Sequence, residues 1–229
     1  MRAEGGRSEG RRNRDCLRPG NATDWQAAFN VTRFLAIFLL LAGMGVADTP
    51  TDRPTNWAQP AAEGALGNFY RISDELYRAK QPTAADIPEL KRVGIKTVLS
   101  LRHHHRDSQE FERAQIKALQ YEMDAGRVSV DGLIKALRLI RAAPKPVLVH
   151  CWHGSDRTGF VVAGYRMVCM NWTAEQAIDE LRRGGFGYHE FFYPNVARVL
   201  RELNVAEVRK AVLADDGGAA VGAKPAGKN

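Results

Sequence analysis

The fold is decided by the stretch Val147-Leu148-Val149-His150-Cys151-Trp152-His153-Gly154-Ser155-Asp156-Arg157-Thr158-Gly159. An apolar run ends at a cysteine, a short loop follows, and Arg157 opens an amphipathic segment. This pattern predicts a buried strand, a loop and a helix in direct succession. Five residues separate Cys151 from Arg157. A loop of that length lets successive backbone N–H groups turn inward at the helix N-terminus, which makes an anion-binding site.

The residue types in this loop suit a phosphoryl group. Arg157 can hold two phosphoryl oxygens at once through its planar fork of donors, which a lysine cannot do. Cys151 lies under the same positive potential, so its thiol should ionise more readily than a free thiol and act as a nucleophile. Gly154 allows the loop backbone to approach a ligand closely. The alternative is an inert cysteine in an ordinary strand–loop–helix unit.

Two segments of the chain resemble a known family. The Cys-x5-Arg motif from Cys151 to Arg157, preceded by His150 and followed by Thr158, resembles the protein tyrosine phosphatase superfamily, in particular its small bacterial dual-specificity-like members. The segment Leu76-Tyr77-Arg78-x-x-Gln81-Pro82, followed by a predicted helix and strand, resembles the same group. The resemblance covers roughly residues 57–203.

The resemblance implies both a fold and a reaction. The fold is α/β, with a small, mostly parallel central sheet flanked by helices and a phosphate loop between a strand and a helix. The reaction is hydrolysis of phosphate monoesters through a phosphocysteine intermediate, without a metal or other cofactor. The substrate would be a phosphorylated protein or a small phosphate ester. Phosphoinositides and inositol phosphates stay open: Ser155 stands where lipid-directed members often have lysine, but Asp156 is shared with lipid and inositol enzymes. The alternative to an enzyme is a module that binds phosphate groups without catalysing their hydrolysis.

The same resemblance assigns roles within the loop. Cys151 and Arg157 are catalytic, Thr158 donates a hydrogen bond to the Cys151 thiolate, and His150 orients the loop. The residues expected to bind the phosphate or support the loop are Trp152, His153, Gly154, Ser155, Asp156 and Thr158. Asp156 also suits a role in buttressing Arg157 or capping the helix.

The general acid is less well defined. An alkoxide or phenoxide leaves poorly unless a nearby carboxylic acid protonates it. Residues 121–127 occupy the position of the superfamily's acid loop, and Asp124 is the first candidate within them. Asp131 is the second, although Asp131 and Ser129 equally suit the cap of the next helix. The loop lacks the Trp-Pro or Pro-Phe pair that leads into the acid elsewhere, so it remains open that neither aspartate serves.

Histidines outside the loop have several interpretations. The run His103-His104-His105 suits a solvated loop, a contact at the rim of the site, or a metal site, although neighbouring histidines in a loop seldom converge on one ion. His189 and Glu190, after a glycine-rich segment, suit a structural turn or the positioning of a hydrolytic water.

Charge and cysteine content limit the partners. Residues 1–47 carry seven arginines against four acids, a net +3, which leaves +4 of the chain's +7 for residues 48–229. That balance suits an enzyme with anionic substrates but provides no basic stripe for nucleic acid. Cys16, Cys151 and Cys169 are too few for a disulfide framework, and we expect Cys169 to be a small core residue.

The N-terminal region reads as a targeting segment. Residues 34–47 contain no charge, are too short for an ordinary membrane span and end in small residues, so we expect a signal peptide over residues 1–47 that is cleaved before Asp48. The preceding polar part is unusually long, and a start at Val31 would give a compact signal. The mature protein would then be periplasmic or secreted, with no stable membrane partner. The alternative is an uncleaved anchor or a buried helix.

The rest of the chain divides into a linker (residues 48–66), a phosphatase domain (67–213) and a disordered tail (214–229). Within the domain we expect strands at 76–78, 95–101 and 147–150. We expect helices at 83–93, 108–119, 132–143, 157–170 and 173–183, and a last helix at 194–203.

Overall fold

The computed structural model describes residues 53–61, 64–103 and 109–214. The expected signal peptide, the alternative start at Val31, residues 215–229 of the predicted tail, His104 and His105 lie outside these residues. None of the helices within the described ranges has both the length and the apolar character that crossing a membrane requires.

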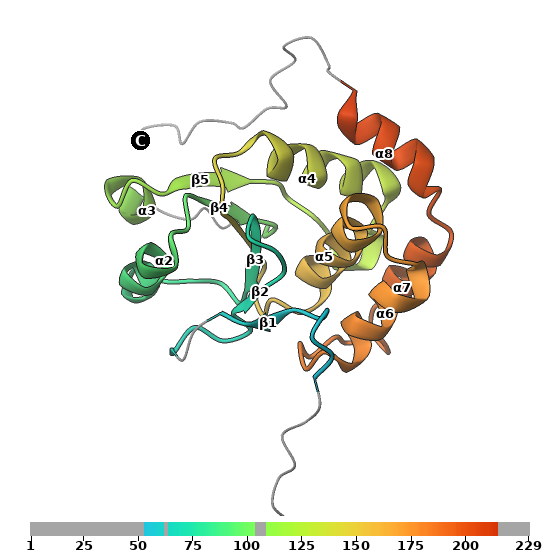
Figure 1. Ribbon diagram of the computed structural model, residues 1–229, viewed down its shortest axis with the longest axis horizontal. Coiled ribbons are helices and arrows are strands. Elements are labelled where there is room, and N and C mark those ends of the chain that lie inside the picture. Colours follow the sequence, from blue (N-terminus) through green and yellow to red (C-terminus); the bar gives the residue numbers. More distant parts are fainter. Residues whose placement is uncertain (1–52, 62–63, 104–108, 215–229) are drawn as a thin grey trace, which may run out of the picture. The chain divides into compact units, whose positions relative to one another are not determined.

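The centre of the fold is a six-stranded sheet with the order β1-β2-β3-β6-β4-β5 (Figure 1). The strands are β1 (Gln59–Pro60), β2 (Tyr70–Arg71), β3 (Leu76–Ala79), β4 (Thr97–Ser100), β5 (Lys117–Gln120) and β6 (Val147–His150). The pairings β3–β6, β6–β4 and β4–β5 are parallel, whereas β1 and β2 extend the sheet antiparallel at one edge. The predicted small, mostly parallel sheet is confirmed, and the strand that ends at Cys151 lies inside it.

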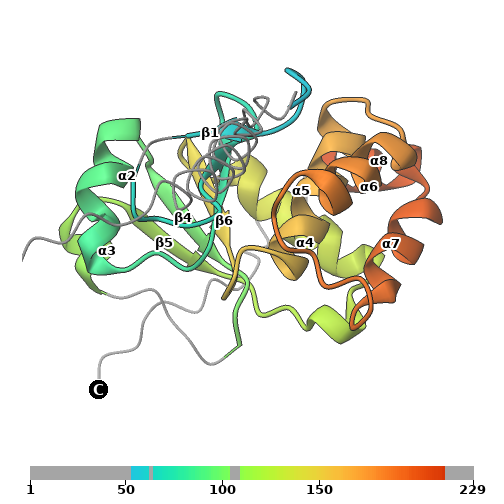
Figure 2. The same cartoon turned by 90° about the horizontal axis from the view of Figure 1, so that it is seen from below.

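Helices cover both faces of the sheet (Figure 2). The short helices α2 (Ile87–Val93) and α3 (Gln109–Arg113) lie on one face. On the other face are α4 (Val130–Ala142), α5 (Asp156–Cys169), α6 (Ala174–Arg183), α7 (Pro194–Arg201) and α8 (Val205–Leu213). The fold class expected from the sequence is therefore confirmed.

Two apolar cores follow from the alternation of side chains along the strands. In β6, Val147 and Val149 join the larger core with α4–α8, and Leu148 joins the smaller core with α2 and α3. In β4, Leu99 joins the larger core and Val98 joins the smaller one. Strands buried on both faces read as continuous apolar runs, which is why these two were recognised in the sequence.

Several element boundaries are also confirmed. The strand 147–150 has the predicted limits, and α6 begins with the predicted capping box between Thr173 and Gln176. α2 ends where expected at Gly94, which has a left-handed φ of 88°. Ser129 caps α4, its Oγ accepting a hydrogen bond from Gly132 N at 3.1 Å.

The predicted helix 108–119 is wrong over its second half. α3 ends at Arg113, Gln115 takes a φ of 62°, and residues Lys117–Gln120 form β5 beside β4. Ile116 and Leu119 have helical spacing, but in the structure they belong to the two different cores. The open edge of β4 supplies backbone partners that the local pattern does not reveal.

The expectation that 194–203 is the last helix is also wrong, because α8 follows it. Asn204 caps α8 by accepting a hydrogen bond from Glu207 N at 3.2 Å, and Val208 and Val212 are buried. Cys169 is a further correction: it is the last residue of α5 and is exposed, so it is not a core residue.

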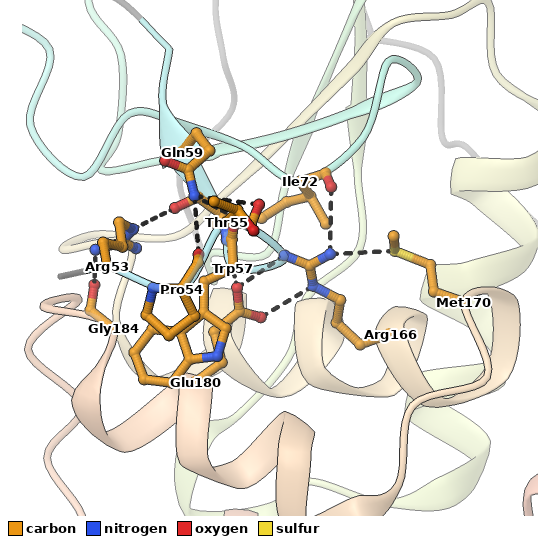
Figure 3. Close-up of polar contacts among 11 residues, drawn as sticks. Arg53, Pro54, Thr55, Trp57, Gln59, Ile72, Arg166, Met170, Glu180 and Gly184 are labelled. Carbon is orange, nitrogen blue, oxygen red and sulfur yellow. Dashed lines mark hydrogen bonds and ion pairs between the residues drawn. The ribbon is translucent and has the colours of Figure 1, made fainter.

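The segment read as a linker contains ordered structure. Its residues 59–60 form β1, and the amide of Ala58 donates a 2.5 Å hydrogen bond to Glu180 Oε1. Glu180 also forms a bidentate, almost fully buried ion pair with Arg166 at 2.7 and 2.9 Å (Figure 3). Arg53 Nη1 donates to the carbonyl of Gly184 at 3.0 Å. Pro54 and Pro60 therefore belong to an edge of the domain and not to a spacer.

Candidate active site

The predicted phosphate loop lies at the carboxyl end of β6 and leads into α5. Cys151 follows β6 directly and is 3% exposed, and Asp156 is the first residue of α5. The loop thus sits at the end of an interior strand of a parallel sheet, where open α/β sheets bind their ligands.

The carbonyl groups of the loop all have partners outside the cup. The contacts are His150 Nδ1 with Cys151 O (3.1 Å), Gln81 N with Trp152 O (3.0 Å), Asn68 Nδ2 with His153 O (2.8 Å) and Arg78 Nη2 with Gly154 O. The backbone N–H groups of residues 152–157 make no hydrogen bond to any group in the described part of the chain. The loop therefore offers donors and no carbonyl oxygens to an anion, as the spacing of Cys151 and Arg157 predicted.

Gly154 is required by both its backbone conformation and its surroundings. Its φ is 76°, which side chains other than glycine rarely adopt. A Cβ at this position would lie 2.4 Å from Ala79 O and 2.7 Å from Lys80 N. The phosphate loop consequently packs directly on the end of β3.

Arg78 is a functional residue that the sequence interpretation missed. It is 1% exposed, donates to Gly154 O, and its guanidinium lies 3.6 Å from the centre of the Phe186 ring. Burial lowers the pKa of Arg78 to about 10, while the charges of Glu180 and Cys151 act in the opposite direction. Arg78 thus remains charged at neutral pH and places a positive charge near the nucleophile. The available signal was a charged residue in the predicted strand 76–78, within the segment Leu76-Tyr77-Arg78 that carries the family resemblance.

Arg157 connects the loop with two other parts of the site. Its Nη1 lies 3.4 Å from Leu101 O, just beyond β4, and 3.5 Å from Met123 O in the predicted acid loop. The side chain is partly buried. The structure therefore brings the predicted acid loop next to the predicted catalytic arginine.

The two candidate acids occupy different places. Asp124 immediately follows Met123, is exposed, and accepts a 2.8 Å hydrogen bond from Gly126 N as the cap of a short 3₁₀ turn, η2 (Ala125–Arg127). Asn195 of α7 holds this turn through a 3.0 Å hydrogen bond to Ala125 O.

Asp131 lies instead in the first turn of α4. Burial, and then the charge of Asp131, raise the pKa of Tyr121. Arg157 thus contacts the residue next to Asp124, whereas Asp131 lies at the start of a helix, where negative charge is stabilising.

Ser155 and Asp156 support the loop with their side chains. Ser155 Oγ donates to Phe186 O at 2.7 Å. Asp156 accepts from His189 N at 2.9 Å and lies 3.0 Å from His189 Nδ1. Both contacts fasten the loop to the glycine-rich turn that precedes His189, and Glu190 is engaged with Arg182. The structural interpretation of His189 and Glu190 is the one that these contacts favour.

The hydrogen bond expected from Thr158 to Cys151 is absent. Thr158 Oγ1 is buried and has no hydrogen-bond partner among the described residues. His150, in contrast, is fully buried and contacts the loop carbonyl that follows it, as an orienting residue would.

Trp152 and His153 are exposed at the rim of the loop. The guanidinium of Arg102 lies 4.0 Å from the centre of the Trp152 ring. Of the three adjacent histidines, His103 is described, and it pairs with Glu122 at 3.4 Å. The residues that the structure describes contain no group of three or more metal-ligating side chains.

Comparison with known proteins agrees with this geometry. Residues 65–190 match the model of the tyrosine phosphatase family. The dual specificity protein phosphatase TpbA of Pseudomonas aeruginosa is 37% identical over 155 residues, covering 67% of this chain and 70% of TpbA. The crystal structure of P. aeruginosa TpbA with pTyr has a TM-score of 0.63 at 33% identity, covering 70% of this chain and 98% of the other. The inositol diphosphatase DSP1 of Oryza sativa subsp. japonica is 30% identical over 135 residues, covering 54% of this chain and 60% of DSP1.

Proposed function

The chain belongs to the tyrosine phosphatase family and is a phosphoric monoester hydrolase of that type; from this premise we propose that it cleaves phosphotyrosine and related protein phosphoesters through a phosphocysteine intermediate. The observation that carries the proposal is the loop from Cys151 to Arg157, whose carbonyls are all bonded outward and whose N–H groups remain as donors. Cys151 stands at the base of this loop and is the nucleophile of the proposal.

The proposed reaction has two steps. The Cys151 thiolate attacks phosphorus, the P–O ester bond breaks, and Asp124 gives its proton to the leaving oxygen. Arg157 and the loop N–H groups hold the phosphoryl oxygens and stabilise the charge that develops on them. Water then attacks the phosphorus of the phosphocysteine while Asp124 takes the water's proton. The S–P bond breaks, inorganic phosphate is released, and Cys151 returns to the thiolate form. Arg78 contributes through the loop, because it fixes Gly154 and adds a buried positive charge.

The composition of the cup favours a phosphate carried by a protein over a free polyanion. Between Cys151 and Arg157 the loop side chains include no lysine or arginine. An inositol polyphosphate carries several anionic groups and would need cations around the cup to hold the groups that are not being cleaved. The likeness to an inositol diphosphatase makes that class the second candidate.

The two cysteines of the described domain provide a matched test. Cys151→Ser should abolish hydrolysis of p-nitrophenyl phosphate but retain binding of inorganic phosphate, because a serine hydroxyl is a much weaker nucleophile than the cysteine sulfur while Arg157 and the loop N–H groups are unchanged. Cys169→Ser should behave like the wild type, since Cys169 is exposed at the far end of α5. A wild-type protein that binds vanadate but hydrolyses none of a panel of aryl, peptide and inositol phosphates would instead be the phosphate-binding module.

For the location, we propose a periplasmic or secreted enzyme that is released before Asp48. The support is the charge-free run at residues 34–47 and its small terminal residues. N-terminal sequencing of the mature protein, together with cell fractionation, tests this proposal. A full-length cytosolic protein would contradict it, and a full-length membrane-bound one would favour the anchor.

A further inference from the structure

Exposed aromatic side chains gather beside the phosphate loop. Five large apolar residues are exposed in the described ranges: Val130 (38%), Trp152 (55%), Phe191 (91%), Phe192 (71%) and Leu213 (58%). Trp152 belongs to the phosphate loop, and Phe191 and Phe192 follow the turn that is bonded to that loop. Single exposed apolar residues are ordinary, but a group of them beside a binding site marks an interaction surface.

Two groups of rings adjoin the phosphate loop: Trp152, His153 and His189 lie in series, and Phe191 and Phe192 form a pair that is joined to His189 through the backbone. The ring centres of Trp152 and His153 are 6.3 Å apart, and those of His153 and His189 are 6.0 Å apart. Phe192 N donates a 3.0 Å hydrogen bond to His189 O, and the rings of Phe191 and Phe192 meet edge to face at 5.4 Å. We call these five residues the aromatic ridge.

The ridge is fixed to the catalytic loop at its inner end. His189 bonds Asp156 with both its backbone N–H and its ring, and Asp156 is the residue before Arg157. A ligand whose phosphate lies in the cup therefore meets the ridge in a defined orientation.

Charged side chains adjoin the outer end of the ridge: the hydrogen bond from Arg182 lowers the pKa of Glu190, and the charge of Arg201 lowers it further. Glu190, next to Phe191, forms a bidentate ion pair with Arg182. Because the turn that carries Phe191 and Phe192 is bonded to Asp156 of the phosphate loop, the partner that these rings meet is the one whose phosphoryl group enters the cup.

We propose that the aromatic ridge binds apolar side chains that flank the phosphorylated residue of a protein substrate. This inference rests on the proposed function, in which the ester enters the cup. An extended peptide advances about 3.3 Å per residue. Residues two or three positions from the phosphorylated one therefore lie about 7–10 Å from it, outside the cup itself.

The test combines one double variant with three substrates. The variant is Phe191→Ala with Phe192→Ala, and the control is Leu213→Ala, an exposed apolar residue on α8. The substrates are p-nitrophenyl phosphate, a phosphotyrosine peptide with leucine and phenylalanine at the flanking positions, and the same peptide with serine and asparagine there.

The double variant should lower kcat/KM for the apolar-flanked peptide about tenfold, through KM, because the lost contacts act on binding. Its kcat/KM values for the polar-flanked peptide and for p-nitrophenyl phosphate should stay within about twofold of wild type. Leu213→Ala should leave kcat/KM unchanged for all three substrates.

Three outcomes would overturn the inference. In the first, the double variant keeps the wild-type preference for the apolar-flanked peptide. In the second, it loses activity equally on all three substrates, which would make the phenylalanines supports of the loop. In the third, wild type but not the double variant sediments with vesicles of phosphatidylethanolamine and phosphatidylglycerol while peptide kinetics are unchanged, which would identify a lipid surface as the partner. Failure of the proposed function would be distinguishable from failure of this inference, because the wild-type protein would then hydrolyse no aryl phosphate at all.

Discussion

The buried guanidinium of Arg78 is hydrogen-bonded to the carbonyl oxygen of Gly154, at the turn of the phosphate loop. The same guanidinium stacks on Phe186, whose carbonyl accepts a hydrogen bond from Ser155. One side chain of β3 thus joins the sheet, the loop and the glycine-rich turn. Because it holds the one loop residue with a left-handed backbone, Arg78 controls the position of the N–H groups on both sides of it.

Replacing Arg78 by lysine should therefore impair the site while keeping the charge. Lysine cannot reproduce the planar stack on Phe186 together with the bond to Gly154. A loop displaced by about 1 Å costs on the order of 100-fold in rate, so we expect kcat for p-nitrophenyl phosphate to fall by that order. The unpaired Gly154 carbonyl should also lower stability by about 1–3 kcal/mol, measured by urea unfolding. Arg71→Lys is the control, because Arg71 makes an exposed ion pair with Asp74; equal losses in both variants would contradict the role given to Arg78.

Comparing Gly154→Ala with a control glycine variant should show whether a steric clash or backbone strain causes the loss of activity. The new Cβ would meet Ala79 O at 2.4 Å and push the loop away from β3, so we expect loss of nearly all turnover. Gly94→Ala is the matched control, since Gly94 also has a positive φ (88°) but no atom within 4 Å of the added Cβ. Gly94→Ala should cost about 1–2 kcal/mol in stability and leave kcat unchanged. Thermal unfolding and steady-state kinetics of both variants decide the matter, and an active Gly154→Ala enzyme would show that the loop tolerates displacement.

Asp124→Asn should slow hydrolysis of alkyl phosphates by about 100-fold or more, as removal of a general acid does. The defect should shrink with p-nitrophenyl phosphate, because nitrophenolate leaves without a proton. Asp131→Asn should change only the start of α4, where Asp131 lies in the first turn. Rates for a series of leaving groups measure the effect in both variants. If only Asp131→Asn shows a defect that depends on the leaving group, Asp131 and not Asp124 is the general acid. If neither variant shows such a defect, the general acid is another group.

Glu180→Gln should destabilise the domain strongly. Glu180 pairs with the fully buried Arg166 and also accepts from Ala58 N, so the variant leaves a buried charge without its counterion. Breaking such a pair costs about 3–5 kcal/mol, which lowers Tm by roughly 10 °C in a domain of this size. The segment around Ala58 should also become sensitive to protease. Asp179→Asn removes the neighbouring exposed pair with Arg183 and should leave Tm unchanged; similar effects in both variants would rule out a special role for the buried pair.

The sequence predicts the parts of this fold whose structure is local. The strand 147–150 is apolar at nearly every position, α6 carries its own capping box, and Gly94 ends α2 with the backbone conformation that glycine favours. The spacing of Cys151 and Arg157 belongs to one loop and needs no distant contact to be recognised.

What the sequence did not predict depends on contacts between distant segments. β5 forms because β4 offers an open edge, and its own residues have the spacing of a helix. In the sequence, Arg78 has the pattern of a polar residue at the end of a short strand. Its role depends on contacts with Gly154 and Phe186, which are distant in the sequence. Asp156 stands inside the phosphate motif, yet its side chain is taken up by His189, 33 residues away. Cys169 is small and follows buried residues, but the helix turns it outward at its last position.

The supports of the phosphate loop also impose an order on its assembly during synthesis. Asn68 and Arg78 lie 85 and 76 residues before the loop atoms that they hold, whereas Phe186 and His189 lie 31 and 33 residues after theirs. A growing chain that has just produced Cys151 and Arg157 therefore possesses the reactive groups but not the frame that arranges them. With the function and location proposed above, Cys151 would become a competent nucleophile only once the chain has passed His189, and therefore only after an unfolded exported chain has crossed the membrane.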